Sequence, residues 1–482
     1  MQESYGFEIQ QILPDIVLST FGIAILLIDP FLSRNKRQRL GVVALLGVLV
    51  AALCTVNLIT NDGTYFSGMV VVDNFSIFFR FIFLLITGLT VLSSLSYLKV
   101  QKLDLGEYHA LLLFANVGMN LMAASNELIM IFLGLETLSI SCYILLGTHR
   151  ASAKSNESAL KYFLLGSFSS AFLLYGVALV YGATRTSNLE LIARAVLSGS
   201  ADMNLIYFAA GLFFVGIGFK VATAPFHVWT PDVYEGAPSP ISAFMSVGPK
   251  AAGFALFLRL FQVALPATYD KWFLVVWVSA VLTMTLGNVV AIVQSNIKRM
   301  LAYSSIAHAG YILVAIAAGT EQGTAAVLFY GLAYTLMNVG AFTVVALVGR
   351  ENEQKVGIED YAGLGSRQPA LAACLSVFLL SLAGIPLTAG FAGKFFIFKA
   401  AVDSHLIWLA VIGVLNSAIS VYYYLRVIVL MYMKASPDEA SAVPVSASVG
   451  VVLGLSVWGI LQLGIYPDLV VRLAQSSVFA LR

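Results

Sequence analysis

The sequence has little charge and little cysteine. Only 11% of its 482 residues are charged, 59% are hydrophobic, and the mean hydropathy is +0.89. These values exclude a water-soluble enzyme and a disordered chain, because both need a more polar composition. The three cysteines, Cys54, Cys142 and Cys374, lie in apolar runs, which excludes a disulfide scaffold and indicates small buried side chains. A net charge of +2 is too small to indicate a nucleic-acid partner.

The N-terminus lacks the basic residues of a cleaved signal peptide. Residues 1–11 include Glu3 and Glu8, and no lysine or arginine precedes the first apolar run. We therefore expect the first helix to remain in the mature protein.

Apolar runs of about 20 residues, the length that crosses a bilayer, fill most of the chain. They predict an all-α polytopic membrane protein with about 14 transmembrane helices. The connection 183–204 contains an amphipathic stretch, 188–198, which predicts a short surface helix. The expected spans are 12–33, 41–60, 74–98, 108–125, 128–147, 158–182, 205–227, 241–264, 272–294, 298–319, 323–348, 369–402, 405–433 and 445–471.

The basic residues between these spans divide unequally when the connections are assigned to alternate sides. Because cytoplasmic loops are rich in lysine and arginine, the richer side is predicted to be inside and both termini outside. On the inner side lie Arg34, Lys36, Arg37, Arg39, Lys99, Lys102, Arg150, Lys154, Lys298, Arg299, Arg350, Lys355, Arg367, Arg426 and Lys434, against Arg185, Arg194, Lys271, Arg472 and Arg482 on the outer side.

The remaining basic residues fall within spans or at their edges. Arg80 and Lys399 lie near enough to the interfaces to extend toward water. The others are the candidates for function because ions inside a membrane are rare and usually functional. The full set is Arg80, Lys161, Lys220, Lys250, Arg259, Lys394 and Lys399.

One carboxylate, Glu136, lies near the middle of a span. An unpaired charge at that depth disfavours insertion by roughly 2.5–3.5 kcal/mol. A structural ion pair or a neutral carboxyl would explain it. A functional role needs basic partners at a similar depth, and the chain supplies them.

Prolines accompany the buried lysines. Pro225 follows Lys220 by five residues, and Pro249 directly precedes Lys250. Since proline has no N–H, each one frees a backbone carbonyl and predicts a break or kink in its helix. In lipid, such a break is tolerated only where protein or water satisfies the freed backbone.

A third such site lies in the long apolar run 369–402, where Pro386 precedes Lys394. The two broken segments predict an internal repeat with its ion path at the breaks. Spans 4–8 and 9–13 would form two inverted halves, 108–265 and 266–434, flanked by helices 1–3 in 1–107 and helix 14 in 435–482.

Lys220, Lys250 and Lys394 together indicate a proton relay biased by Glu136. Burial favours the neutral form of a lysine and a nearby carboxylate favours the charged form, so movement of the carboxylate can load or unload a proton. His308, mid-span, is a further candidate for passing protons.

Glu157 and Lys161, four residues apart, are either a simple salt bridge on a helix surface or part of an inner proton path.

Several motifs resemble the antiporter-like membrane subunits of respiratory complex I, the proton-translocating NADH-quinone oxidoreductase, which are related to Mrp antiporters. The resemblance covers nearly the whole chain, and the stretch HVWTPDVY is its most specific part. The motifs are FHVWTPDVYEGAPSP at 226–240, NIKRMLAYSSI at 296–306, SLAGIP at 381–386 with GFAGK at 390–394, and ESALKY at 157–162.

The resemblance implies fourteen helices with inverted five-helix repeats and broken seventh and twelfth helices. It places Glu136 and Lys220 at the family's coupling pair, Lys250 at the central relay lysine and Lys394 in the second half-channel. The chain is too short for the lateral helix of subunit L, and Lys394 stands where subunit M typically has glutamate.

The resemblance also implies a bacterial inner-membrane protein with both termini on the periplasmic side. The expected partners are the lipid bilayer, the neighbouring subunit M and the small subunits K and J. No cofactor is expected in this chain, and NADH, FMN, iron–sulfur clusters and quinone (including ubiquinone) would belong to other subunits. Two alternatives stay open, an Mrp-type sodium/proton antiporter subunit and a scaffold subunit that does not pump.

Overall fold

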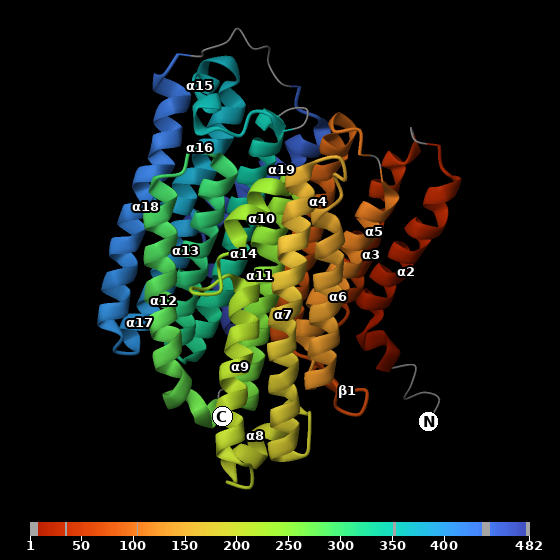
Figure 1. Cartoon of the computed structure of the whole chain (residues 1–482), viewed down its shortest axis with the longest axis vertical. Coiled ribbons are helices and arrows are strands. Elements are labelled where there is room, and N and C mark those ends of the chain that lie inside the picture. Colours follow the sequence, from red (N-terminus) through yellow and green to blue (C-terminus); the bar gives the residue numbers. More distant parts are fainter. Residues whose placement is uncertain (1–7, 34–35, 104, 350–352, 436–443, 479–482) are drawn as a thin grey trace.

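The computed structural model describes residues 8–33, 36–103, 105–349, 353–435 and 444–478 as a bundle of long helices (Figure 1). Of the residues used above, Glu3, Arg34, Arg350 and Arg482 lie outside these ranges. The all-α membrane fold predicted from the sequence is confirmed.

The long helices follow the expected apolar runs closely. Their bounds are α2 (Leu13–Ile28), α3 (Gln38–Val56), α4 (Asn74–Val100), α5 (Gly106–Ala124), α6 (Leu128–Leu146), α7 (Ala153–Thr184), α9 (Met203–Val221), α11 (Ser239–Leu258), α12 (Tyr269–Ile292), α13 (Ile297–Ala317), α14 (Glu321–Gly349), α16 (Pro369–Ala383), α17 (Ala389–Asp403), α18 (Ile407–Met433) and α19 (Ala447–Ile465).

Short elements complete the fold. Strand β1 (Gly63–Tyr65) pairs antiparallel with β2 (Val70–Val72), with Gly63 opposite Val72. The expected surface helix is confirmed as α8, and Asn188 caps it by accepting a hydrogen bond from the Leu191 N–H at 3.1 Å. The short helices are η1 (Asp29–Phe31), α8 (Leu189–Leu197), α10 (Thr230–Gly236), η3 (Arg259–Ala264), η4 (Pro266–Thr268), η6 (Ile358–Tyr361), α15 (Leu364–Arg367) and α20 (Asp468–Ser476).

Twelve helices in the described ranges are long and apolar enough to cross a membrane. Two expected spans fall outside this set. One is α5, which carries the buried polar residues His109, Asn116 and Asn120. The other is 369–402, which consists of α16 and α17, each 15 residues long. The total of fourteen therefore remains a prediction.

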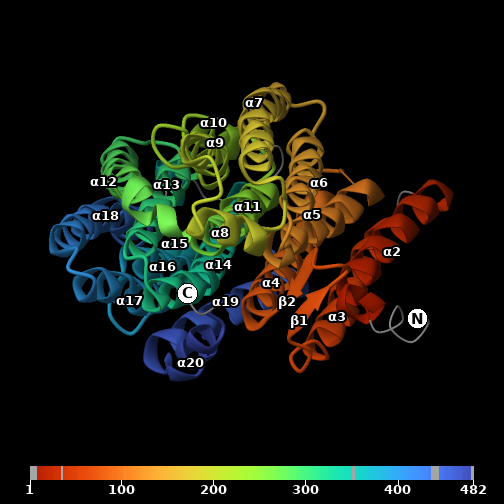
Figure 2. The same cartoon turned by 90° about the horizontal axis from the view of Figure 1, so that it is seen from below.

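Helices α11, α13 and α14 form the centre of the bundle. Every residue of α11 is buried, as is nearly all of α13. Figure 2 shows α11 and α14 inside a ring that includes α4, α7, α9, α12 and α16. The surrounding helices expose apolar side chains, for example Phe168 on α7 and Leu274 on α12, as a lipid-facing surface requires. Residues on α11 and α13 are thereby shielded from lipid.

Side-chain caps fix where two helices of the bundle begin. Asp73 caps α4 by accepting from the Ser76 N–H at 2.8 Å, and the Ser76 hydroxyl accepts from the Asp73 N–H at 3.1 Å. Asn296 caps α13 by accepting from the N–H groups of Lys298 and Arg299. These caps satisfy backbone donors that the first helical turn leaves unpaired.

Candidate functional site

The first break separates α9 from α10 near Pro225, as the sequence predicts. Helix α9 ends at Val221, Ala222 has a left-handed backbone conformation, and α10 begins at Thr230. The Trp229 indole N–H donates to the Phe219 carbonyl at 3.0 Å and satisfies part of the broken end. This break places Lys220 in the last turn of α9, where a helix favours positive charge.

Lys220 is buried and bonded to two hydroxyl groups. Its Nζ donates to Ser139 Oγ on α6 at 2.7 Å and to the Tyr162 hydroxyl on α7 at 3.1 Å. The expected partner Glu136 lies one turn before Ser139 on α6. Within the described ranges no ion pair joins Glu136 to Lys220, and Glu136 Oε1 is buried without a hydrogen-bond partner. The Lys220 ammonium therefore has two hydroxyl partners and is not paired with the Glu136 carboxylate.

The break expected at Pro249 is wrong. Helix α11 continues through Pro249 from Ser239 to Leu258. The carbonyl that the proline deprives of its N–H donor is that of Met245, four residues earlier. The Tyr234 hydroxyl on α10 donates to that carbonyl at 2.9 Å. Since the freed carbonyl has a partner from another helix, α11 can stay helical.

Lys250 lies next to this proline and points at α13. Its Nζ donates to the Ser305 carbonyl at 2.7 Å and to the Ser305 hydroxyl. Gly253, on the next turn of α11, lets α11 pack against α9, because a Cβ there would lie 2.6 Å from Val221 and 3.6 Å from the Cβ of Lys220. Lys220 and Lys250 thus lie on directly packed helices.

His308 lies in the middle of a group of aromatic hydroxyls. Its Nδ1 is hydrogen-bonded to the Tyr330 hydroxyl at 2.5 Å and its Nε2 to the Tyr424 hydroxyl at 3.2 Å. The Tyr424 hydroxyl is also bonded to Ser304. The imidazole therefore has a hydroxyl partner on each nitrogen, the arrangement that a proton carrier requires.

The second break separates α16 from α17 around Pro386, again as predicted. Lys394, on α17, turns back to the end of α16, where its Nζ donates to the carbonyls of Leu382 at 2.9 Å and Ala383 at 3.0 Å. It also donates to Ser417 Oγ at 2.9 Å. Lys220 precedes its break, whereas Lys394 follows its own, so the two lysines are not at equivalent positions in sequence.

Helix α13 connects the central lysine to the last one. Ser305, His308 and Tyr311 are spaced three residues apart and therefore share one face of the helix. Ser305 bonds Lys250, and the Tyr311 ring lies 4.8 Å from Lys394 Nζ. The sequence reasoning missed Ser305 and Tyr311, although their spacing around His308 is the signal that would have found them.

Glu157 and Lys161 form an ion pair at 2.6 Å, and they belong to a larger network. Lys161 also contacts Asp232 on α10 at 2.8 Å, and Asp232 contacts Arg299 on α13 at 2.7 Å. Glu235, one turn further along α10, joins Arg299 at 3.0 Å and Lys154 at 3.2 Å. The network fastens α10 to both α7 and α13. The sequence analysis missed Asp232 and Glu235, which lie in the motif at 226–240.

Arg80 does not extend to an interface as the sequence analysis expected. It is 1% exposed and forms an ion pair with Asp15 on α2 at 2.8 Å. Asn120 on α5 donates to the other Asp15 oxygen at 2.8 Å. Asp15 and Arg80 each lie within two turns of the start of their helix, so Arg80 finds a buried acidic partner on α2 where an extension toward water was expected. Lys399 is exposed, in agreement with its predicted place, and pairs with Asp403 at 2.5 Å.

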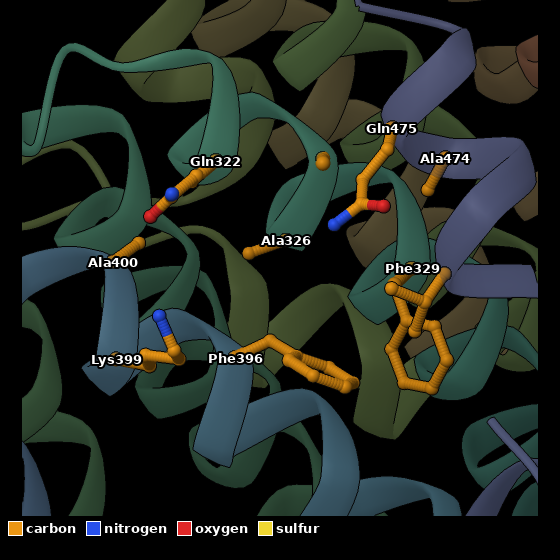
Figure 3. A pocket seen from close by; sticks show the side chains of 10 residues that line it. Gln322, Ala326, Phe329, Phe396, Lys399, Ala400, Ala474 and Gln475 are labelled. Atoms are coloured by element: carbon orange, nitrogen blue, oxygen red, sulfur yellow. The ribbon is translucent and has the colours of Figure 1, made fainter. Parts of the chain in front are cut away.

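A pocket outside the lysine row lies between α14, α17 and α20 (Figure 3). Phe329 and Phe396 give it an apolar wall, and Lys399 and Gln475 lie at its edges. None of the candidate relay residues lines it. We therefore keep the candidate site to the row on α9, α11, α13 and α17.

The fold and the row of Lys220, Lys250, His308 and Lys394 define a class of protein. It is a polytopic membrane protein whose broken and central helices carry buried ionisable side chains, as in ion-translocating proteins. The family model for the transmembrane part of NADH:quinone oxidoreductase/Mrp antiporter proteins matches residues 125–420. The chain belongs to this family.

Relatives match over almost their whole length. NADH-quinone oxidoreductase subunit N of Trichlorobacter lovleyi is 52% identical over 97% of this chain and 96% of its own. The protein of the same name from Chloroflexus aggregans is 42% identical over 98% of each chain. The resemblance recognised from the motifs is confirmed, and subunit N is the antiporter-like subunit to which this chain is related.

Solved structures of related membrane complexes contain chains with the same fold. A chain of respiratory complex I from Thermus thermophilus superposes with a TM-score of 0.82 at 34% identity, covering 96% of this chain and 99% of that chain. A chain of the Mrp complex from a Dietzia species also gives a TM-score of 0.82, at 20% identity over 97% of each chain, and shares the fold.

Proposed function

We propose that this chain is a membrane-arm subunit of a proton-translocating NADH-quinone oxidoreductase and that the row Lys220, Lys250, His308 and Lys394 carries protons across it. The observation that carries the proposal is the face of α13 that joins Lys250 at Ser305 to Lys394 at Tyr311. The relatives named NADH-quinone oxidoreductase subunit N support the assignment to that enzyme.

Glu136, at one end of the row, controls whether Lys220 is protonated. One Glu136 oxygen has no hydrogen-bond partner among the described residues, and the Lys220 ammonium donates to two neutral hydroxyls there. A carboxylate that approaches Lys220 stabilises the charged lysine, and one that withdraws releases a proton toward Lys250. His308 then passes the proton toward Lys394. Glu157 and Lys161, near the start of α7, belong to the inner path by which protons reach the row.

The two halves 108–265 and 266–434 form inverted repeats, flanked by helices 1–3 in 1–107 and helix 14 in 435–482. The two breaks, at α9–α10 and at α16–α17, support this division. Both termini lie on the periplasmic side of the bacterial inner membrane. The charge distribution of the connections supports this orientation.

The redox chemistry takes place in other subunits. NADH, FMN, iron–sulfur clusters and quinone bind there, and this chain receives a conformational or electrostatic signal from electron transfer. Its neighbours are the antiporter-like subunit M and the small subunits K and J. The matches to complex I and Mrp assemblies support a position among other membrane subunits.

The test is NADH-driven proton pumping in membrane vesicles that carry Lys220→Ala, with assembly checked on native gels. The matched control is Lys399→Ala, because Lys399 is exposed and paired within its own helix. We expect the Lys220 variant to assemble and to lose pumping together with coupled NADH oxidation, while the control keeps both.

Other outcomes identify the alternatives. An assembled Lys220 variant with wild-type pumping would make the lysine structural and favour the scaffold subunit. Sodium-dependent transport without NADH would instead favour an Mrp-type antiporter. Glu136→Gln should slow pumping and leave assembly unchanged, because the amide keeps the shape but not the charge.

A further inference from the structure

Tyr234 supplies a hydrogen bond to α11 that Pro249 makes necessary. Pro249 removes the N–H that would pair with the Met245 carbonyl inside α11. The Tyr234 hydroxyl takes its place at 2.9 Å, from a different helix. Both residues are buried. The helical hydrogen bond at this turn of α11 is therefore supplied by α10.

The hydrogen bond from Tyr234 to the Met245 carbonyl supports the turn of α11 that orients the Lys250 side chain. Lys250 directly follows Pro249, and a helical side chain lies over the turn that precedes its own Cα. The Lys250 ammonium lies 6.0 Å from the centre of the Tyr234 ring and donates to the Ser305 carbonyl at 2.7 Å. A change at the Met245 carbonyl consequently alters the direction in which Lys250 points.

Tyr234 is carried by the short helix that the ion network holds. Asp232, two residues before it, contacts Lys161 and Arg299. Glu235, directly after it, contacts Arg299 and Lys154. A displacement of α10 through these charges must move the Tyr234 hydroxyl with it.

We propose that Tyr234 is a positioning residue that transmits movement of α10 to Lys250 through the Met245 carbonyl, with Pro249 as the flexible joint. The inference rests on the proposed proton-pumping function. It assigns the proline a role other than breaking the helix. A continuous α11 with its own N–H at residue 249 would hold the turn closed whatever α10 does.

The experiment compares Tyr234→Phe, Pro249→Ala and the double variant in the assembled complex. The measured quantities are the number of protons moved per NADH oxidised and the thermal midpoint of the solubilised complex. The control is Tyr269→Phe, because Tyr269 also donates to a helical carbonyl, that of Ala317 at 2.7 Å, but lies away from the lysine row.

We expect both single variants to lower the proton-to-NADH ratio and the control to leave it unchanged. Pro249→Ala should do so without lowering the thermal midpoint, because alanine supplies the missing N–H. In the double variant the midpoint should recover relative to Tyr234→Phe while the ratio stays low.

A double variant that regains the ratio would overturn the proposal, because satisfying the carbonyl would then be the whole role of Tyr234. Unchanged ratios in both single variants would overturn it as well. Lys250→Ala separates this failure from that of the proposed function. If Lys250→Ala also keeps the wild-type ratio, the proposed proton relay through Lys250 is wrong. If Lys250→Ala alone lowers the ratio, only the positioning role of Tyr234 and Pro249 is rejected.

Discussion

The Nζ of Lys394 lies 2.9 Å from the carbonyl oxygen of Leu382, the carbonyl that Pro386 leaves without a helical donor. A side chain on the second half-helix thus completes the end of the first. The same ammonium is attracted to the negative end of the α16 dipole. The contact therefore stabilises the break and fixes a titratable group at the same time.

We expect Lys394→Met to lower stability and abolish pumping. Removing the ammonium leaves the Leu382 carbonyl without its donor and the Ala383 carbonyl with only the Ser417 hydroxyl at 3.3 Å. A buried unpaired acceptor costs about 1–3 kcal/mol. The thermal midpoint of the solubilised complex and NADH-driven pumping would measure the two effects. Lys399→Met is the control, because an exposed pair such as Lys399 with Asp403 contributes no more than about 0.5 kcal/mol. Equal midpoints for the two variants would contradict the structural part of this prediction.

Arg80→Met should strongly reduce the amount of folded subunit in the membrane. It leaves the Asp15 charge buried without its partner, which typically destabilises by about 3–5 kcal/mol. Adding Asp15→Leu removes the stranded charge, so the double variant should recover much of the loss. Protein levels and resistance to limited proteolysis are suitable measurements. Failure of the double variant to recover would show that Asn120, which bonds Asp15, also depends on the charge.

Gly390→Ala should push α16 and α17 apart. A Cβ at residue 390 would lie 1.8 Å from the Ser381 carbonyl oxygen, which is part of the backbone and cannot turn aside. Assembly on native gels should fall sharply. Gly454→Ala, on α19, is the matched control, since no described atom lies within 4 Å of its added Cβ. That control should be neutral or slightly stabilising, because alanine favours a helix more than glycine. Normal assembly of the Gly390 variant would argue against the close contact.

Acid should weaken the fold through Glu353. Its carboxylate accepts from Lys298 Nζ at 2.6 Å and from the Tyr97 hydroxyl and the Ser239 N–H at 2.7 Å each. Burial acts to raise the pKa of Glu353, but the Lys298 charge and these hydrogen bonds outweigh it and hold the pKa below its ordinary value of 4.5. Because the folded pKa is the lower one, the stabilisation is present above pH 4.5 and is lost as the pH falls through the folded pKa.

Glu353→Gln removes this linkage. Its thermal midpoint should start lower at neutral pH and should fall less than that of the wild-type protein as the pH drops below 4.5. The exposed Glu321→Gln variant should follow the wild-type curve. Parallel curves for Glu353→Gln and the wild-type protein would show that another group controls the acid sensitivity.

The apolar runs and the intramembrane charges predicted most of the fold and the positions of the breaks at Pro225 and Pro386. They did so because in lipid a span must be apolar along about 20 residues and a proline must free a carbonyl. The break at Pro249 could not be judged in this way. Whether a freed carbonyl opens the helix depends on Tyr234, whose approach is decided by packing and not by local sequence.

The partners of the buried charges were equally hidden. Lys220 bonds Ser139 and Tyr162, which are distant in sequence and carry no charge that marks them. Arg80 was expected near an interface, because its pairing with Asp15 depends on how α2 packs beside α4 and α5 and not on local sequence. By contrast, the spacing of Ser305, His308 and Tyr311 was visible in the sequence.

The hydrogen bonds of Glu353 also determine where a tag or label can be inserted into the chain. The connection after α14 is tied to α4, to the start of α11 and to α13, so an epitope tag or a fluorescent label inserted there would pull on several helices at once. In the described part of the chain, the hydrogen bonds given for Ser198, Gly199 and Ser200, between α8 and α9, stay within α8 and this turn, and Gly199 and Ser200 are exposed. Labels for imaging or distance measurement are therefore best placed at that turn.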